Sequence, residues 1–133
     1  MHPAPSSPAA HQPRRERLLA ATYLAVAAAP WLFIAGMAAW AWRAAVVLGR
    51  WPAPLADDPQ SIASGDQLYD RLGRLSDALG YWLLLSPLIL PVFVLMTWRG
   101  YRRRTSYAII AVYVIGLIVI RLDPFGLLAW AFA

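Results

Sequence analysis

The longest stretch of the chain without a charged residue runs from Leu18 to Trp42. At about 1.5 Å per residue, a helix over this stretch is about 37 Å long, which exceeds the roughly 30 Å of a bilayer's hydrocarbon core. The stretch therefore predicts a first transmembrane helix, which we expect to cover about residues 18–48. Pro30 lies inside it and removes one backbone N–H, so we expect a kink there that neighbouring groups in a membrane tolerate.

Two further uncharged stretches follow the first. Residues 78–98 form one that is long enough to span, in which Pro87 and Pro91 lie one helical turn apart and predict a bend. The stretch from Thr105 to Ile120 is the shortest of the three. It can span the bilayer if the flanking arginines snorkel and the bilayer thins locally. We predict the second and third spans over about residues 78–98 and 105–122.

The composition agrees with a membrane protein. Hydrophobic residues make up 60% of the chain and charged residues 14%, whereas soluble domains average about 45–50% and about 25%. The predicted fold class is all-α, an integral membrane protein with three transmembrane helices plus short interfacial helices. Residues 18–133 form a single transmembrane domain in this prediction, and the proline-rich residues 1–17 form a disordered basic cytoplasmic tail.

The predicted outer loop, residues 49–77, is the largest segment between the spans. Asp58-Pro59 has the sequence of a helix N-cap followed by a proline in the first turn, and Ser64 with Gln67 fits a capping box. Leucines then recur at helical spacing, at Leu68, Leu72, Leu75 and Leu79. We therefore expect an amphipathic helix that lies on the membrane surface and leads into the second span.

The chain after the third span repeats the cap-plus-proline signal at Asp123-Pro124. The apolar residues that follow are too few to cross a bilayer. We predict an interfacial C-terminal helix over residues 124–133, which Phe125, Trp130 and Phe132 anchor in the membrane surface.

The arginines predict the orientation. Three precede the first span, and four fall between the second and third spans: Arg99, Arg102, Arg103 and Arg104. Segments rich in arginine stay in the cytoplasm, so we predict a multi-pass protein of the bacterial inner (cytoplasmic) membrane with a cytoplasmic N-terminus and a C-terminus outside. The same four arginines are candidates for contact with anionic phospholipid headgroups of the lipid bilayer.

Aromatic residues agree with this orientation, because Trp and Tyr concentrate at membrane interfaces. We expect Tyr23, Trp98, Tyr101 and Tyr107 at the inner interface and Trp40, Trp42, Trp51, Tyr81 and Trp82 at the outer one. The main alternative for the first segment is a secretory signal cleaved after Ala25-Val26-Ala27. It is less favoured, because the apolar run continues beyond that site as far as Trp42.

Several kinds of chemistry are excluded. The chain has no cysteine, and its two histidines, His2 and His11, lie in the N-terminal tail, so thiolate chemistry and a histidine-ligated metal inside the membrane are excluded. The uncharged stretches lack the charged residue that coupled transport uses, and Ser86 has no base beside it for nucleophilic catalysis. We predict no catalytic residue, no metal and no cofactor.

Five aspartates lie in the predicted outer loop: Asp57, Asp58, Asp66, Asp70 and Asp77. Carboxylates near a membrane surface can bind Ca²⁺ or Mg²⁺. Structural roles explain these residues better, with Asp58 as a helix cap, Asp66 in the first turn of the amphipathic helix, and Asp70 and Asp77 on its solvated face. An enzyme that acts on lipid headgroups through these aspartates is therefore the least favoured function.

The segment Leu48-Gly49-Arg50-Trp51-Pro52-Ala53-Pro54, followed by Asp57-Asp58-Pro59, resembles a segment of small uncharacterised bacterial multi-pass membrane proteins, with the pattern LGxWPxP…DDP. The resemblance covers about a dozen residues. It implies a membrane location and a small number of spans, and it carries over no catalytic residue.

The function that we predict is that of a non-enzymatic accessory or assembly component that contacts another membrane protein. The candidate interaction loop consists of Trp51, Pro52, Pro54, Asp57 and Asp58. The alternative is a small transport or permeation unit formed by a homo-oligomer. We predict no nucleic-acid partner, because no pattern for base recognition accompanies the arginines.

Overall fold

The computed structural model describes residues 21–132 of the 133-residue chain, except residues 55, 60, 63–64 and 99–102. Within these residues the structure is helical and has no strand, so the all-α prediction is confirmed for this part of the chain. The helices are α2 (Ala29–Leu48), α3 (Gln67–Trp98), α4 (Arg103–Leu122) and α5 (Leu127–Ala131). The predicted tail, residues 1–17, lies outside the described residues.

The first long helix is interrupted just before Pro30. Residues 21–27 are helical, Ala28 forms a turn, and α2 begins at Ala29. Pro30 has no N–H to donate to the carbonyl four residues earlier. The N–H of Leu32 donates to the carbonyl of Ala28 at 2.9 Å, so helical bonding resumes directly after the proline. The interruption therefore lies where the sequence predicts one.

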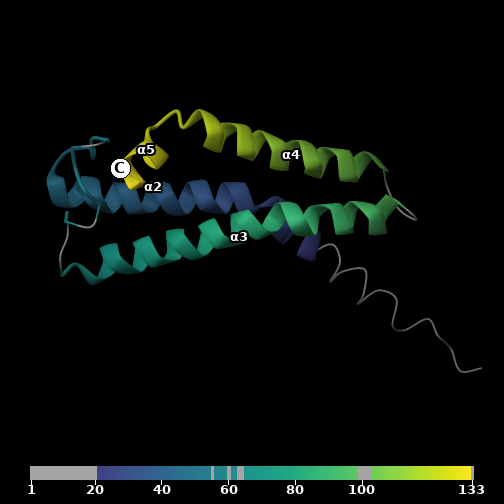
Figure 1. The fold of residues 1–133 in the computed structure, drawn as a ribbon, viewed down its shortest axis with the longest axis horizontal. Coiled ribbons are helices and arrows are strands. Elements are labelled where there is room, and N and C mark those ends of the chain that lie inside the picture. Colours follow the sequence, from purple (N-terminus) through teal and green to yellow (C-terminus); the bar gives the residue numbers. More distant parts are fainter. Residues whose placement is uncertain (1–20, 55, 60, 63–64, 99–102, 133) are drawn as a thin grey trace, which may run out of the picture.

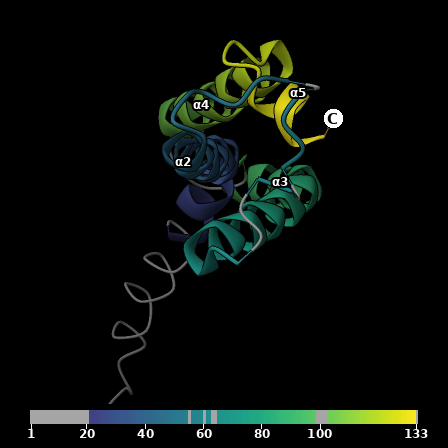
Figure 2. The same cartoon turned by 90° about the vertical axis from the view of Figure 1, so that its left-hand side faces the viewer.

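α2 lies at the centre of the bundle. It packs against α3, α4 and α5, and the three long helices run side by side (Figure 1). The view along the bundle shows α4 above α2 and α3 below it, with α5 between them on one side (Figure 2). The buried core follows this arrangement and draws on three helices: Phe33, Met37, Ala41 and Ala44 of α2, Tyr69 of α3, and Leu127 and Trp130 of α5.

Small residues bring α2 and α3 close together. A Cβ atom added at Gly73 would lie 3.3 Å from the indole of Trp40, and one added at Gly80 would lie 3.4 Å from the ring of Phe33. On α2, a Cβ atom at Gly36 would come within 2.8 Å of a methyl group of Leu79. Two aromatic rings of α2 therefore rest on glycines of α3, and the helices approach more closely than larger side chains would permit.

A buried pair of hydroxyl groups joins α3 to α4. The hydroxyl of Ser86 donates to the carbonyl of Leu83 at 2.7 Å, and it lies 2.6 Å from the hydroxyl of Tyr113. Because the single proton of Ser86 goes to Leu83, Tyr113 is the donor in the second bond. The Leu83 carbonyl is the one that Pro87 leaves without its helical N–H. Ser86 thus supplies the missing donor, and α3 continues through both of its prolines.

α3 is longer than the predicted second span. It runs for 32 residues without interruption, so the predicted surface helix and the span over residues 78–98 are one helix. The outer loop correspondingly shortens from residues 49–77 to residues 49–66.

Only part of the leucine row of α3 packs against α2, where Leu79 contacts the core. Leu68 and Leu75 are exposed, whereas Tyr69 and Ser76 are buried. The reason is that the face with Tyr69 and Ser76 also carries the glycines on which the aromatic rings of α2 rest. That face permits a closer approach of the two helices than the leucine face does.

The C-terminal helix is shorter than the predicted helix over residues 124–133. α5 covers only Leu127–Ala131, and Gly126 precedes it as the N-cap with a φ of 66°. Asp123 has a φ of 41° and lies in a turn before the helix, and its carboxylate accepts the N–H of Ala129 at 2.9 Å. The predicted cap is therefore displaced from Asp123 to Gly126, although the Asp123 carboxylate still satisfies one amide of α5.

Trp130 of α5 is a core residue and does not anchor the surface. It is 1% exposed, and its ring centroid lies 4.9 Å from that of Trp40. Phe125 and Phe132 are exposed, as predicted. The predicted anchoring through Trp130 is wrong, because α5 folds back onto α2 and buries this face.

Trp82 does not lie at the level predicted for it. Its indole N–H donates to the carbonyl of Ala25 at 3.4 Å, so it lies near Tyr23, which we expected at the opposite interface. At about 1.5 Å per helical residue, Trp40 lies about 22 Å further along the chain than Ala25. Trp82 and Trp40 therefore cannot share one outer interface.

One helix of the described residues, α2, is long and apolar enough to cross a membrane, with a mean hydropathy of 1.6. Only 28% of its apolar window is buried, whereas a core helix of a soluble protein is mostly buried. Tyr107–Leu122 is a shorter apolar helix. Large apolar side chains also face outward from the other two long helices, among them Leu84, Leu85, Leu88 and Leu95 of α3 and Val112, Ile115 and Ile118 of α4.

Candidate functional site

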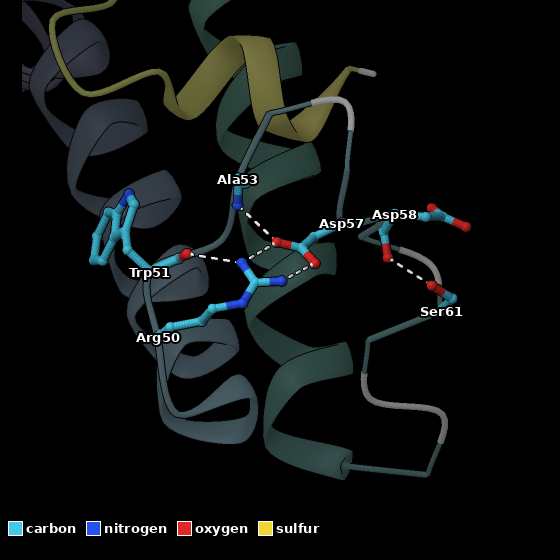
Figure 3. Close-up of polar contacts among 6 residues, drawn as sticks. All are labelled: Arg50, Trp51, Ala53, Asp57, Asp58 and Ser61. Atoms are coloured by element: carbon cyan, nitrogen blue, oxygen red, sulfur yellow. Dashed lines mark hydrogen bonds and ion pairs between the residues drawn. The ribbon is translucent and has the colours of Figure 1, made fainter.

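The loop between α2 and α3 contains an ion pair that closes it on itself. The guanidinium of Arg50 donates to both carboxylate oxygens of Asp57, each at 2.7 Å (Figure 3). One of these oxygens also accepts the backbone N–H of Ala53 at 2.7 Å, and Arg50 donates to the carbonyl of Trp51 at 3.3 Å. The residues between Arg50 and Asp57 therefore form a compact turn.

Prolines and a glycine explain why the chain turns here. Gly49 ends α2 in the left-handed conformation, with a φ of 67°, which glycine adopts without strain. Pro52 and Pro54 exclude the residues before them from helical geometry, so the helix cannot resume. The chain instead returns, and Asp57 comes within reach of Arg50.

The Arg50–Asp57 pair is fully charged at neutral pH. The hydrogen bond from Arg50, followed by that from the N–H of Ala53, lowers the pKa of Asp57 below its ordinary value of 3.8. The same hydrogen bond and the negative charge of Asp57 raise the pKa of Arg50. The turn is therefore closed by two opposite charges over the whole physiological pH range.

A second ion pair connects α2 to the beginning of α3. Arg43 Nε donates to Asp66 Oδ2 at 2.9 Å, and Asp66 Oδ1 accepts the N–H groups of Leu68 and Tyr69 at 2.9 and 3.1 Å. Asp66 is thus the N-cap of α3 and does not lie in the first turn, as the sequence suggested. The bond from Tyr69, followed by that from Arg43, lowers the pKa of Asp66.

Asp58 does not begin a helix. Its carbonyl accepts the N–H and the hydroxyl of Ser61, both at 3.0 Å, so Asp58-Pro59 forms a turn. The carbonyl of Pro59 accepts the hydroxyl of Tyr69 at 2.6 Å, which ties this turn to α3. Burial, with a smaller contribution from the charge of Asp58, raises the pKa of Tyr69 to about 12. The predicted cap at Asp58 is wrong, and Ser64 of the predicted capping box lies outside the described residues.

The five residues of the predicted interaction loop divide into two groups. Pro52 is buried and the side chain of Asp57 is only 10% exposed, so these two hold the loop together. Trp51, Pro54 and Asp58 are exposed. The ring of Trp51 is 48% exposed and points away from the ion pair (Figure 3). Trp51 is therefore a large apolar side chain that the loop exposes.

Two of the four predicted headgroup arginines lie in the described part of the chain. Arg103 and Arg104 form the beginning of α4. Arg99 and Arg102 lie outside the described residues. The beginning of α4 lies at the end of the bundle remote from the loop between α2 and α3 (Figure 1).

A groove of about 1090 Å³ lies beside the loop. Its lining comes from α2, from α3, from the turn at Asp58 and from the end of α5, which are far apart in the sequence. One lining residue, Ser76, buries a side-chain hydroxyl that has no hydrogen-bond partner. No sequence pattern could have indicated this site, because only the packing of four segments creates it.

The described residues do not bring three or more His, Asp or Glu side chains together in a way that would hold a metal ion. No protein-family model, no curated protein and no solved structure matches the chain. The geometry of the loop and the groove is therefore the basis for the functional inferences that follow.

Proposed function

We propose that this chain is a small integral protein of the bacterial inner membrane whose three long helices cross the bilayer, and that it serves as an accessory or assembly component of another membrane protein. The outward-facing apolar side chains support the membrane placement. Removing apolar surface from water is favourable by about 25 cal/mol per Å², and exposed apolar patches of this extent mark surfaces that lipid or protein covers. The arginines between α3 and α4 support a cytoplasmic N-terminus and a C-terminus outside.

The packing of the helices supports a single apolar layer. Gly116 of α4 lies against Pro30 of α2, and Leu79 of α3 lies against Gly36 of α2. These contacts bring residues 21–37, 78–98 and 105–120 side by side, and we take these residues as the shared layer. The described residues of 38–77 and 123–132 then project beyond this layer on the outer side, and we refer to them as the cap.

The cap has an aromatic core that holds it together. The ring of Trp40 lies 5.5 Å from that of Tyr69 and 4.9 Å from that of Trp130. The two ion pairs fix the loop over this core, so Trp51 is held in a defined position before any partner binds. A large aromatic side chain that is exposed and preorganised is typical of residues that anchor protein interfaces. This fixed, exposed tryptophan is the observation that carries the accessory role.

A photo-crosslinking experiment tests the accessory role. A benzoylphenylalanine replaces Trp51 in one variant and Tyr107, a more exposed aromatic residue on α4, in a matched control. We expect a discrete adduct with a foreign protein from the Trp51 position after irradiation of native membranes, and none from the Tyr107 position. Identical adducts at both positions, or none at Trp51, would contradict the proposal, and an adduct of twice the mass of the chain would favour the homo-oligomeric transport unit.

A labelling experiment tests the membrane placement independently. Because the chain contains no cysteine, single cysteines report their own positions without background. We expect Ser61→Cys in the loop to react with a membrane-impermeant maleimide in spheroplasts, and Ser6→Cys in the tail to react only after lysis. The reverse pattern would invert the orientation, and release of the protein by alkaline carbonate would refute the membrane placement.

A further inference from the structure

The groove changes from polar to apolar along α3. Asp70, Arg74 and Asp77 follow one another at the spacing of one helix face, and all three line the end of the groove that lies in the cap. One to two turns further along the same helix, Leu83 and Leu84 line it. These leucines belong to the proposed apolar layer, so the groove crosses the outer boundary of that layer.

The remaining walls preserve this polarity. Asp58 of the loop lines the polar end, and Phe33 of α2 and the exposed Phe132 line the rest with apolar surface. The polar end thus carries three carboxylates and one guanidinium, with an excess of negative charge. An amphiphile with a purely anionic head would be repelled there, whereas a head with an ammonium group beside a phosphate would find opposite charges for both.

An unsatisfied polar atom gives a second indication of a ligand. Ser76 is 2% exposed, and its hydroxyl has no hydrogen-bond partner. Ser76 lines the groove between its polar and apolar ends, and its Oγ lies next to Gly36 of α2. A buried donor without a partner costs about 1–3 kcal/mol, and the ester carbonyls of a phospholipid are acceptors found at this depth, between the head and the chains.

We propose that the groove binds one aminophospholipid of the phosphatidylethanolamine class, with its ammonium group at Asp70 and Asp77, its phosphate at Arg74 and an acyl chain along Leu83 and Leu84. The volume of about 1090 Å³ exceeds the roughly 300–1,000 Å³ of pockets for small molecules. The proposal depends on the membrane placement above, but not on the role of Trp51. Its failure is therefore distinguishable from failure of the accessory role.

Photolabelling maps the bound lipid. The purified full-length protein is reconstituted in nanodiscs that contain a trace of phosphatidylethanolamine, or of phosphatidylglycerol, with the same diazirine-bearing acyl chain. We expect phosphatidylethanolamine to label Leu83, Leu84 and Phe132 in excess over Ile115 and Ile118, which face outward on α4. Equal labelling of both sets of residues, or equal labelling by the two lipids, would overturn the proposal.

Charge variants test the headgroup contacts. In Asp70→Asn with Asp77→Asn we expect the preference for phosphatidylethanolamine to fall by up to about fivefold for each carboxylate, since exposed charge pairs contribute up to about 1 kcal/mol. Arg74→Gln should weaken retention of both lipids, while Arg71→Gln, an exposed arginine outside the groove, is the matched control and should change nothing. Native mass spectrometry of the detergent-solubilised protein counts the retained lipids, and an unchanged preference in the double variant would refute the assignment. If the double variant does not fold, the comparison of the two lipids on the unmodified protein still tests whether the groove prefers phosphatidylethanolamine.

Discussion

Replacing Trp130 by alanine should detach α5 from the bundle. α5 has five residues, and a helix of that length has no stability of its own in water. Its attachment depends on Leu127 and Trp130, which are buried in the core, and on the hydrogen bond from Ala129 to Asp123. Trp130 is by far the largest of these contacts.

The expected magnitude follows from the burial. Trp130 is 1% exposed and stacks at an angle against Trp40, and truncation of a buried tryptophan to alanine costs about 3–5 kcal/mol. The hydrogen bond from Ala129 contributes only about 1 kcal/mol. The population of the detached state should therefore rise by more than about a hundredfold in Trp130→Ala, and by about fivefold in Asp123→Ala.

Hydrogen exchange of the peptide that contains α5 measures this population. In Trp130→Ala the protection of its amides should fall by two orders of magnitude or be lost, whereas Phe132→Ala, which truncates a side chain that is 79% exposed, should leave it unchanged. Trp130→Phe should stay close to the unmodified protein, because it keeps a buried ring and removes an indole N–H that has no partner. Undiminished protection in Trp130→Ala would refute the inference that α5 is held by this contact.

Two further predictions concern hydrogen bonds. The carboxylate of Asp57 has a lowered pKa, so its stabilising effect on the loop is present at and above pH 3.8 and is lost as the pH falls further through the lowered pKa; exchange of the Ala53 amide should accelerate only in that acid range, and acceleration near pH 5 would contradict the assignment. Ser86→Ala should destabilise the bundle by about 1–3 kcal/mol, because it leaves the buried Tyr113 hydroxyl unpaired, whereas Tyr113→Phe should cost only about 1 kcal/mol, because Ser86 keeps its bond to Leu83. Thermal unfolding in detergent compares the two variants, and a larger loss for Tyr113→Phe would show that the hydrogen bonds are not arranged as described.

The long helices could be predicted from the sequence because a run of residues without charge is a local property. Their ends could not be predicted in the same way. Asp58-Pro59 and Asp123-Pro124 carry the same cap-plus-proline signal, and neither begins a helix directly. α3 begins after Asp66, whose carboxylate is held by Arg43 of the preceding helix. This contact joins two residues that are 23 positions apart in the sequence. It favours Asp66, and not Asp58, as the residue at which α3 begins.

The loop of the candidate site could be predicted from the sequence because it is a local feature, whereas the groove could not. The sequence indicated a loop around Trp51, and the exposed tryptophan lies in that loop. The partners of its charges, and the groove beside it, depend on which face of α3 meets α2. The leucines did not indicate which face of α3 meets α2, because hydrophobicity alone does not reveal that an aromatic ring on α2 packs best against a glycine on α3.

In the proposed membrane placement, α3 belongs to the cap at one end and to the apolar layer at the other, and its helix is continuous between the two. A continuous helix transmits force along its axis, so a pull or a tilt imposed on the loop reaches the far end of α3 at Trp98. The most compliant point of α3 is at Pro87, where a serine hydroxyl replaces a backbone hydrogen bond. The hydrogen bond between Ser86 and Tyr113 lies beside Pro87, and it couples any motion of α3 at this point to α4.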